Sequence, residues 1–185
     1  MRAAAGNRQS FHGRLKSVPS GYLHQQRSVG HVGTGIQIVI ARISTSLDTD
    51  AERAWRAVQR KSTFLYVTKG VLGIADADRY PEEWHAGDVV RARLVFFGFL
   101  PGWMHELRLV RVDGERRELY TNERGGVLSA WNHCITVEPA GATRCRYTDE
   151  IDMDAGLLTP LVWLYAHIFF RYRQMRLRRL ARTLT

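Results

Sequence analysis

The sequence is poor in cysteine and contains no long uninterrupted apolar run. Its 185 residues include only two cysteines, Cys134 and Cys145, and neither lies in a CxxC arrangement. Two such cysteines cannot form the disulfide framework of a small secreted domain or a structural zinc site. The apolar stretch 157–170 is about fourteen residues, interrupted by Pro160 and His167, whereas a membrane-spanning helix needs roughly 20. Residues 1–35 also lack the apolar core of a secretory leader, so we expect a cytoplasmic protein.

Acidic residues are missing from both ends of the chain, and this decides what the net charge of +9 means. Residues 1–35 contain five basic residues and no acid, and residues 171–185 contain six arginines and no acid. The middle of the chain is close to neutral, with 16 basic and 18 acidic residues. A basic body of the kind that binds nucleic acid is therefore not expected. Residues 1–35 show no periodic apolar pattern and are predicted to form a disordered basic extension before a folded domain, residues 36–185.

The motifs of several common enzyme classes are absent. The sequence has no Walker loop, no GxSxG elbow and no HExxH. The histidines of the central region, His85, His105 and His133, do not have the i, i+2 or i, i+4 spacing that metal sites favour. We therefore expect no metal and no cofactor.

Patterns that are present predict an α+β domain. Apolar residues alternate over 37–46, which predicts a first strand. A helix should follow, with Asp48 or Thr49 as its N-cap and Glu52 completing a capping box with Thr49. A second short helix is predicted over 62–67.

Six further strands are predicted, and the turns between them are short. The strands span 70–75, 89–99, 105–113, 116–123, 127–138 and 143–154, with turns that include Pro101-Gly102, Asp113-Gly114 and Gly125-Gly126. Strands joined by such short turns must be antiparallel. The chain then ends in a long helix with Pro160 in its first turn and apolar residues at three- and four-residue spacing.

Four stretches resemble the START-like helix-grip superfamily, in particular its SRPBCC group of polyketide cyclase/dehydrase and lipid-transport proteins. They are 47–55 (LDTDAERAW), 86–90 (AGDVV), 147–151 (YTDEI) and 170–174 (FRYRQ), and the resemblance extends over 36–183. It implies a curved antiparallel sheet of about seven strands wrapped around the long C-terminal helix, with two short helices after the first strand. It also implies an internal cavity for an apolar or amphipathic small molecule.

Alternation along the last two strands indicates which side chains face such a cavity. A five-residue loop, 139–143, would place His133 directly opposite Asp149 and Ile135 opposite Tyr147. An imidazole beside a carboxylate is the arrangement of a general base, and it is equally the arrangement of two buried polar groups that satisfy each other. The candidate catalytic residues are His133, Asp149 and Tyr147. The candidate ligand-binding residues are Val90, Ala92, Leu94, Phe96, Leu107, Leu109, Trp131, His133, Ile135, Tyr147, Asp149, Ile151, Leu161, Tyr165 and Ile168.

Two surface features have more than one explanation. The apolar turn region 96–103 can be a lid, a membrane-touching tip, a dimer contact, or a turn folded over the end of the sheet. The final helix carries six arginines, Arg171, Arg173, Arg176, Arg178, Arg179 and Arg182. They either contact an anionic membrane or complement the helix dipole as a solvated face.

Three functions follow from these observations. The first is binding of a hydrophobic or aromatic small molecule, a lipid or polyketide-like compound, by a monomer or homodimer. The second is a cyclase or aromatase of the same fold, with His133 as base, Asp149 orienting it and Tyr147 as proton donor or oxyanion partner. The third is docking to a membrane or a partner through the basic end of the final helix together with the aromatic turn region 96–103. The sequence shows no second well-placed acid–base pair, so binding is preferred over catalysis.

Overall fold

The structure is a computed structural model and describes residues 39–184. The predicted extension, residues 1–35, lies outside the described residues. The elements follow in the order β1 (Val39–Leu47), α1 (Ala51–Val58), α2 (Lys61–Thr68), β2 (Leu72–Ile74), β3 (Val89–Phe96), β4 (Leu100–Asp113), β5 (Glu118–Gly125), β6 (Leu128–Pro139), β7 (Cys145–Asp154) and α3 (Thr159–Ala181). Within residues 39–184, no helix is both long enough and apolar enough to cross a membrane.

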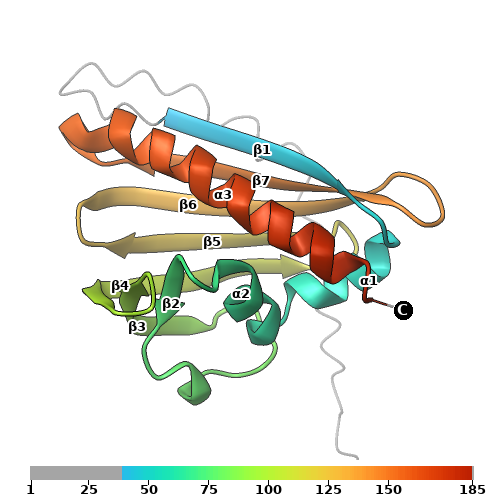
Figure 1. The fold of residues 1–185 in the computed structure, drawn as a ribbon, viewed down its shortest axis with the longest axis horizontal. Helices are drawn as coiled ribbons and strands as arrows, with labels where there is room; N and C mark the ends of the chain where they lie inside the picture. The colour runs from blue at the N-terminus through green and yellow to red at the C-terminus, as the bar shows by residue number, and fades with distance from the viewer. Residues whose placement is uncertain (1–38, 185) are drawn as a thin grey trace, which may run out of the picture. The chain divides into compact units, whose positions relative to one another are not determined.

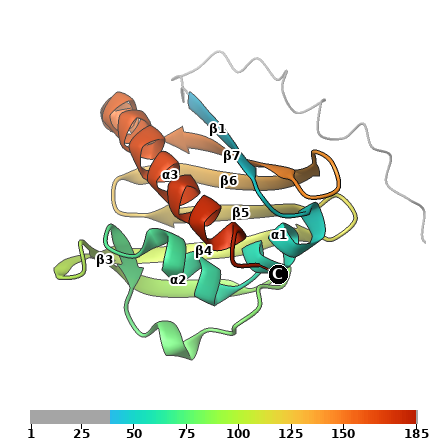
Figure 2. The same cartoon turned by 45° about the vertical axis from the view of Figure 1, so that its right-hand side comes forward.

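The seven strands form one antiparallel sheet with the order β1-β7-β6-β5-β4-β3-β2. The first strand thus pairs with the last, and the others follow as a meander. Figures 1 and 2 show the long helix α3 lying across one face of the curved sheet, with α1 and α2 beside its C-terminal half. This is the helix-grip arrangement, and it confirms the predicted fold class.

The N-cap of helix α1 lies two residues after the first predicted cap, Asp48. Asp50 is the N-cap, because its backbone is extended and its carboxylate accepts a hydrogen bond of 2.9 Å from the Arg53 N–H. Neither Asp48 nor Thr49 caps the helix, so this prediction was wrong. Glu52 still lies in the first turn, where its negative charge interacts favourably with the positive end of the helix dipole.

The turn between β3 and β4 does not lie at Pro101-Gly102, as predicted, but at Phe97 and Gly98. Both turn residues have a positive φ, 54° and 81°. A tight hairpin needs such a conformation, and Gly98 adopts it without strain. Gly102 lies inside β4. A glycine is needed at this position because a Cβ there would be 2.7 Å from the Phe96 ring. Strand β4 therefore starts five residues before the predicted strand.

The pairing of β6 with β7 differs from the predicted register by two residues. His133 lies opposite Ile151, and Ile135 lies opposite Asp149. The reason is that β6 continues to Pro139, so the five-residue loop starts one residue later than expected. Because side chains alternate with a period of two, this shift leaves every residue on its predicted face.

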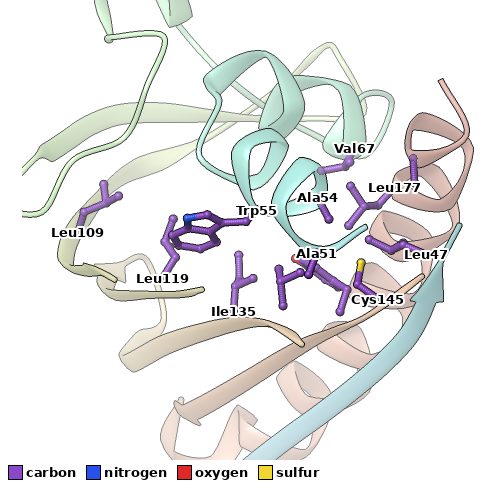
Figure 3. Close-up of a cluster of buried hydrophobic side chains, with 13 residues drawn as sticks. Leu47, Ala51, Ala54, Trp55, Val67, Leu109, Leu119, Ile135, Cys145 and Leu177 are labelled. Carbon is purple, nitrogen blue, oxygen red and sulfur yellow. The ribbon is translucent and has the colours of Figure 1, made fainter. Parts of the chain in front are cut away.

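Two clusters of buried apolar side chains hold α3 and α1 against the sheet. In the first, the Trp55 indole lies between α1 and the sheet, near Leu119 and Ile135 (Figure 3). In the second, Trp131 stacks against Phe170 of α3, with ring centroids 6.1 Å apart. Residues from both clusters also line an internal cavity.

Candidate functional site

A cavity of about 500 Å³ lies between the sheet and the helices α2 and α3. Small-molecule sites in proteins are commonly 300–1,000 Å³ and mostly apolar. The structure brings twelve of the predicted ligand-binding residues to its wall: Val90, Ala92, Leu94, Phe96, Leu107, Leu109, Trp131, His133, Ile135, Tyr147, Leu161 and Tyr165. Helix α2 adds Phe64 and Val67, which are not among the predicted ligand-binding residues.

Three predicted ligand-binding residues do not line this cavity. Ile168 is 64% exposed, because the inner stripe of α3 runs through Tyr165 and Phe169 and leaves Ile168 on the outer face. Ile151 is fully buried in the second apolar cluster. Asp149 is also fully buried, behind the side chains that form the wall.

Asp149 is the centre of a buried hydrogen-bond network. Its Oδ1 accepts hydrogen bonds from His133 Nε2 and from the Tyr147 hydroxyl, both at 2.8 Å, and its Oδ2 accepts one of 2.9 Å from Gln174 Nε2. Gln174 also donates to the carbonyl oxygen of Ile43 at 2.8 Å, which ties β1, β7 and α3 together. Burial alone would raise the pKa of Asp149, but the hydrogen bond from His133 and the positive charge of Arg173 outweigh it and lower the pKa.

This network fixes the roles of the two other candidate catalytic residues. An ionised carboxylate can only accept, so His133 Nε2 carries the proton and Nδ1 is the nitrogen left for a ligand. Burial and the Asp149 charge raise the pKa of Tyr147 well above its usual value, so its hydroxyl stays protonated and donates to Asp149. Of the three, His133 is therefore the group best placed to exchange a proton with a bound molecule.

A second histidine–carboxylate pair lines the same cavity. His105 Nε2 lies 2.9 Å from Glu123 Oε2, and the Thr121 hydroxyl donates to Glu123 Oε1 at 2.8 Å. Burial would raise the pKa of Glu123, but the hydrogen bond and charge of His105 outweigh it and lower the pKa. The expectation that no second acid–base pair exists was wrong. Alternation along β4 and β5 could have revealed this pair. His105 shares a face with Leu107, and Glu123 shares one with Thr121 and Leu119.

The two pairs form a row across the sheet. Thr121 lies opposite His133 in the pairing of β5 with β6, and its hydroxyl is 3.5 Å from the His133 carbonyl oxygen. The row therefore runs from His105 on β4 through Glu123 and Thr121 to His133 and Asp149 on β7. Among residues 39–184, no group of three or more His, Cys, Asp or Glu side chains is arranged to hold a metal ion.

The cavity opens near the start of α3. Leu161 and Val127 both line it, yet they are 65% and 50% exposed. The mouth therefore lies between the first turn of α3 and the β5–β6 turn. In the neighbouring β3–β4 turn, Phe97 and Phe99 are 59% and 80% exposed, so this turn is not folded over the end of the sheet.

Two arginines at the C-terminal end of α3 contact other parts of the domain. Arg176 donates to the Tyr66 carbonyl oxygen at 2.7 Å and stacks on the Tyr66 ring, and Arg182 pairs with Asp48 at 3.5 Å. Figures 1 and 2 place the C-terminal end of α3 beside α1, well apart from the β3–β4 turn. A docking surface that combines the arginines with the aromatic turn is therefore not formed in this structure.

The lowered pKa values of Asp149 and Glu123 predict acid sensitivity. A carboxyl group whose pKa is depressed by folding contributes stability above its unfolded pKa, about 3.9 for Asp and 4.3 for Glu, and loses it as pH falls through the folded value. We expect the free energy of unfolding to decrease below about pH 4. Urea unfolding between neutral pH and pH 3 measures this. Glu123→Gln should show a shallower decrease, and an identical slope in both proteins would contradict the assignment.

The chain has the helix-grip fold, and the comparisons with known proteins agree with it. Residues 69–181 match the family model described as "Domain of unknown function (DUF8410)", and the chain belongs to that family. No curated protein matches the sequence.

Solved structures with the same fold have low sequence identity to this chain. Norcoclaurine synthase from Thalictrum flavum is 14% identical, with a TM-score of 0.59, over 82% of this chain and 97% of its own. A START superfamily protein from Mycobacterium smegmatis is 13% identical, with a TM-score of 0.61, over 79% and 99%. The Zhui aromatase/cyclase from Streptomyces sp. R1128 is 15% identical, with a TM-score of 0.58, over 79% and 94%. At this level of identity the likeness establishes the fold.

Proposed function

We propose that this protein binds a hydrophobic or aromatic small molecule, such as a lipid or polyketide-like compound, in the internal cavity. The observation that carries the proposal is the cavity itself, about 500 Å³ with a mostly apolar wall. Protein interiors pack as densely as organic crystals and contain few voids larger than a water molecule. A cavity of this size is therefore a binding site rather than a packing defect. In this proposal the protein acts in the cytoplasm, where the free cysteines Cys134 and Cys145 stay reduced.

The aromatic lining of the wall favours a ligand with an apolar or aromatic body and few polar atoms. Trp84, Trp103 and Trp131 present large apolar faces, and the mouth between Leu161 and Val127 is apolar as well. One solved structure of norcoclaurine synthase holds dopamine and hydroxybenzaldehyde, two aromatic small molecules, and that protein is 15% identical to this chain with a TM-score of 0.58. A similar class of ligand is consistent with the aromatic wall described here.

Acid–base catalysis on the bound molecule is a second candidate function. The observation that favours it is the presence of two histidine–carboxylate pairs, His133–Asp149 and His105–Glu123, along one cavity wall. In a cyclase- or aromatase-like reaction His133 Nδ1 would take a proton, and Asp149 would stabilise the imidazolium that forms. Tyr147 would act through its hydrogen bond to Asp149.

Native mass spectrometry, followed by solvent extraction, tests binding. We expect the purified protein to carry one apolar molecule per chain, or to take up one when incubated with a lipid extract. The extract from His133→Gln separates the two candidate functions. A binding protein yields the same molecule from both forms, whereas an enzyme yields unreacted substrate from the variant. Absence of any one-to-one complex under both conditions would contradict binding.

A further inference from the structure

We propose that the ligand is an organic acid, with its apolar body in the cavity and its carboxylate bound by the guanidinium of Arg173. This inference rests on the proposed function and names the chemical class of the ligand. Arg173 lies on the face of α3 that lines the cavity. This face has a four-residue spacing and consists of Tyr165, Phe169, Arg173 and Leu177. No other lysine or arginine among residues 39–184 lines it.

Aromatic rings hold the guanidinium of Arg173 in place. Its central carbon lies 4.9 Å from the ring centroid of Phe170 and 5.8 Å from that of Phe169. These contacts orient the group but offer no hydrogen-bond acceptor. Arginine presents five N–H donors in a planar fork, and two of them can bond the two oxygens of one carboxylate. A carboxylate is therefore the partner that fits Arg173 best.

The Arg173 side chain makes no hydrogen bond to any other side chain or backbone group among residues 39–184. Its Nε is buried and has no hydrogen-bond partner. Among residues 39–184, no carboxylate oxygen lies within 4.0 Å of the guanidinium, whereas Arg182, the C-cap of the same helix, pairs with Asp48 at 3.5 Å. Arg173 is half-buried, and its Nε is the buried part: a buried N–H donor without an acceptor is unfavourable. An anionic group on the ligand would supply that partner.

The carboxylates near the cavity already have their own donors. Asp149 accepts hydrogen bonds from His133, Tyr147 and Gln174. Glu123 interacts with His105 and Thr121. A basic ligand would therefore compete with existing hydrogen bonds, while an acidic ligand would add bonds that are missing. Phe170 contacts both Arg173 and His133: its ring centroid lies 4.9 Å from the central guanidinium carbon and 4.9 Å from the centroid of the His133 ring, which places the anion subsite on the His133 side of the cavity.

Two ligands with the same alkyl chain test this inference. Decanoate and decan-1-ol differ in the charge of the head group, and displacement of the neutral dye N-phenyl-1-naphthylamine at neutral pH measures the affinity of each. Charge-assisted hydrogen bonds contribute enough for us to expect decanoate to bind about 10-fold or more tightly than decan-1-ol. Arg173→Met, which keeps an unbranched apolar side chain against the rings, should bind both ligands with equal affinity.

Arg171→Met is the matched control, because it removes the same charge from an exposed position on α3. It should keep the preference for decanoate. Equal affinity of the wild-type protein for both ligands would overturn the inference and leave the proposed function intact. A preference that persists in Arg173→Met would also overturn it. If the wild-type protein binds the dye and neither ligand, the acid-binding inference fails alone, and if it binds none of the three, the proposed function fails with it.

Discussion

Replacing Asp149 with alanine is expected to lower the free energy of unfolding by about 3 kcal/mol or more, because three buried donors each lose their acceptor at a cost of about 1–3 kcal/mol. Asp149 is fully buried and accepts hydrogen bonds from His133, Tyr147 and Gln174. The substitution removes the acceptor of all three donors. Gln174 cannot compensate by rotating its amide, because its Nε2 also donates to the Ile43 carbonyl oxygen.

Urea unfolding monitored by tryptophan fluorescence measures this effect, and Glu150→Ala is the matched control. Glu150 is the next residue on β7 but faces the other side of the sheet, and its ion pair with Arg42, at 3.6 Å, is partly exposed. Loss of such a surface pair costs about 0–1 kcal/mol. An Asp149→Ala protein no less stable than Glu150→Ala would show that the buried network does not stabilise the fold.

Filling the cavity should abolish binding with little loss of stability. Ala92 lies in the middle of β3, is 4% exposed and lines the cavity. In Ala92→Trp the indole would occupy space that the ligand needs, so we expect affinity for N-phenyl-1-naphthylamine to fall about 100-fold or more, or roughly 3 kcal/mol. In a tightly packed core the same substitution would cost about 1–3 kcal/mol of stability, whereas a cavity can accept the added side chain.

Val110→Trp controls for the added tryptophan, because Val110 is 46% exposed on β4 and does not line the cavity. It should bind the dye as the wild-type protein does. Unchanged affinity in Ala92→Trp would mean that the dye binds elsewhere. A large loss of stability in Ala92→Trp would mean that the space beside Ala92 is closed.

The sequence predicted the faces of the strands better than their pairing. Alternation placed His133, Asp149 and Tyr147 on the inner face, and the structure joins them in one network. The register was wrong by two residues, because alternation does not show whether β6 ends at Glu138 or at Pro139. A shift of two residues leaves each side chain on the same face. His133 therefore still contacts Asp149, as a diagonal neighbour rather than as the residue directly opposite.

The second half of the site was missed because its residues are charged or lie beside a misplaced turn. Placing the turn at Pro101-Gly102 moved His105 to the start of a strand, near a loop, whereas it lies well inside β4. An inward carboxylate such as Glu123 is not expected from hydrophobic patterning alone. Arg173 is one of six arginines in residues 171–185, and composition cannot separate it from its exposed neighbours. Only the packing of α3 against the sheet does so.

Titration of the unmodified protein with N-phenyl-1-naphthylamine tests the cavity most directly. We expect a single saturable site per chain. The emission of the dye should shift to the blue, because the dye enters a cavity lined by apolar residues such as Leu109 and Phe169. Fluorescence that rises linearly without saturation, or that saturates equally in Ala92→Trp, would contradict the claim that this protein binds a small molecule in its interior.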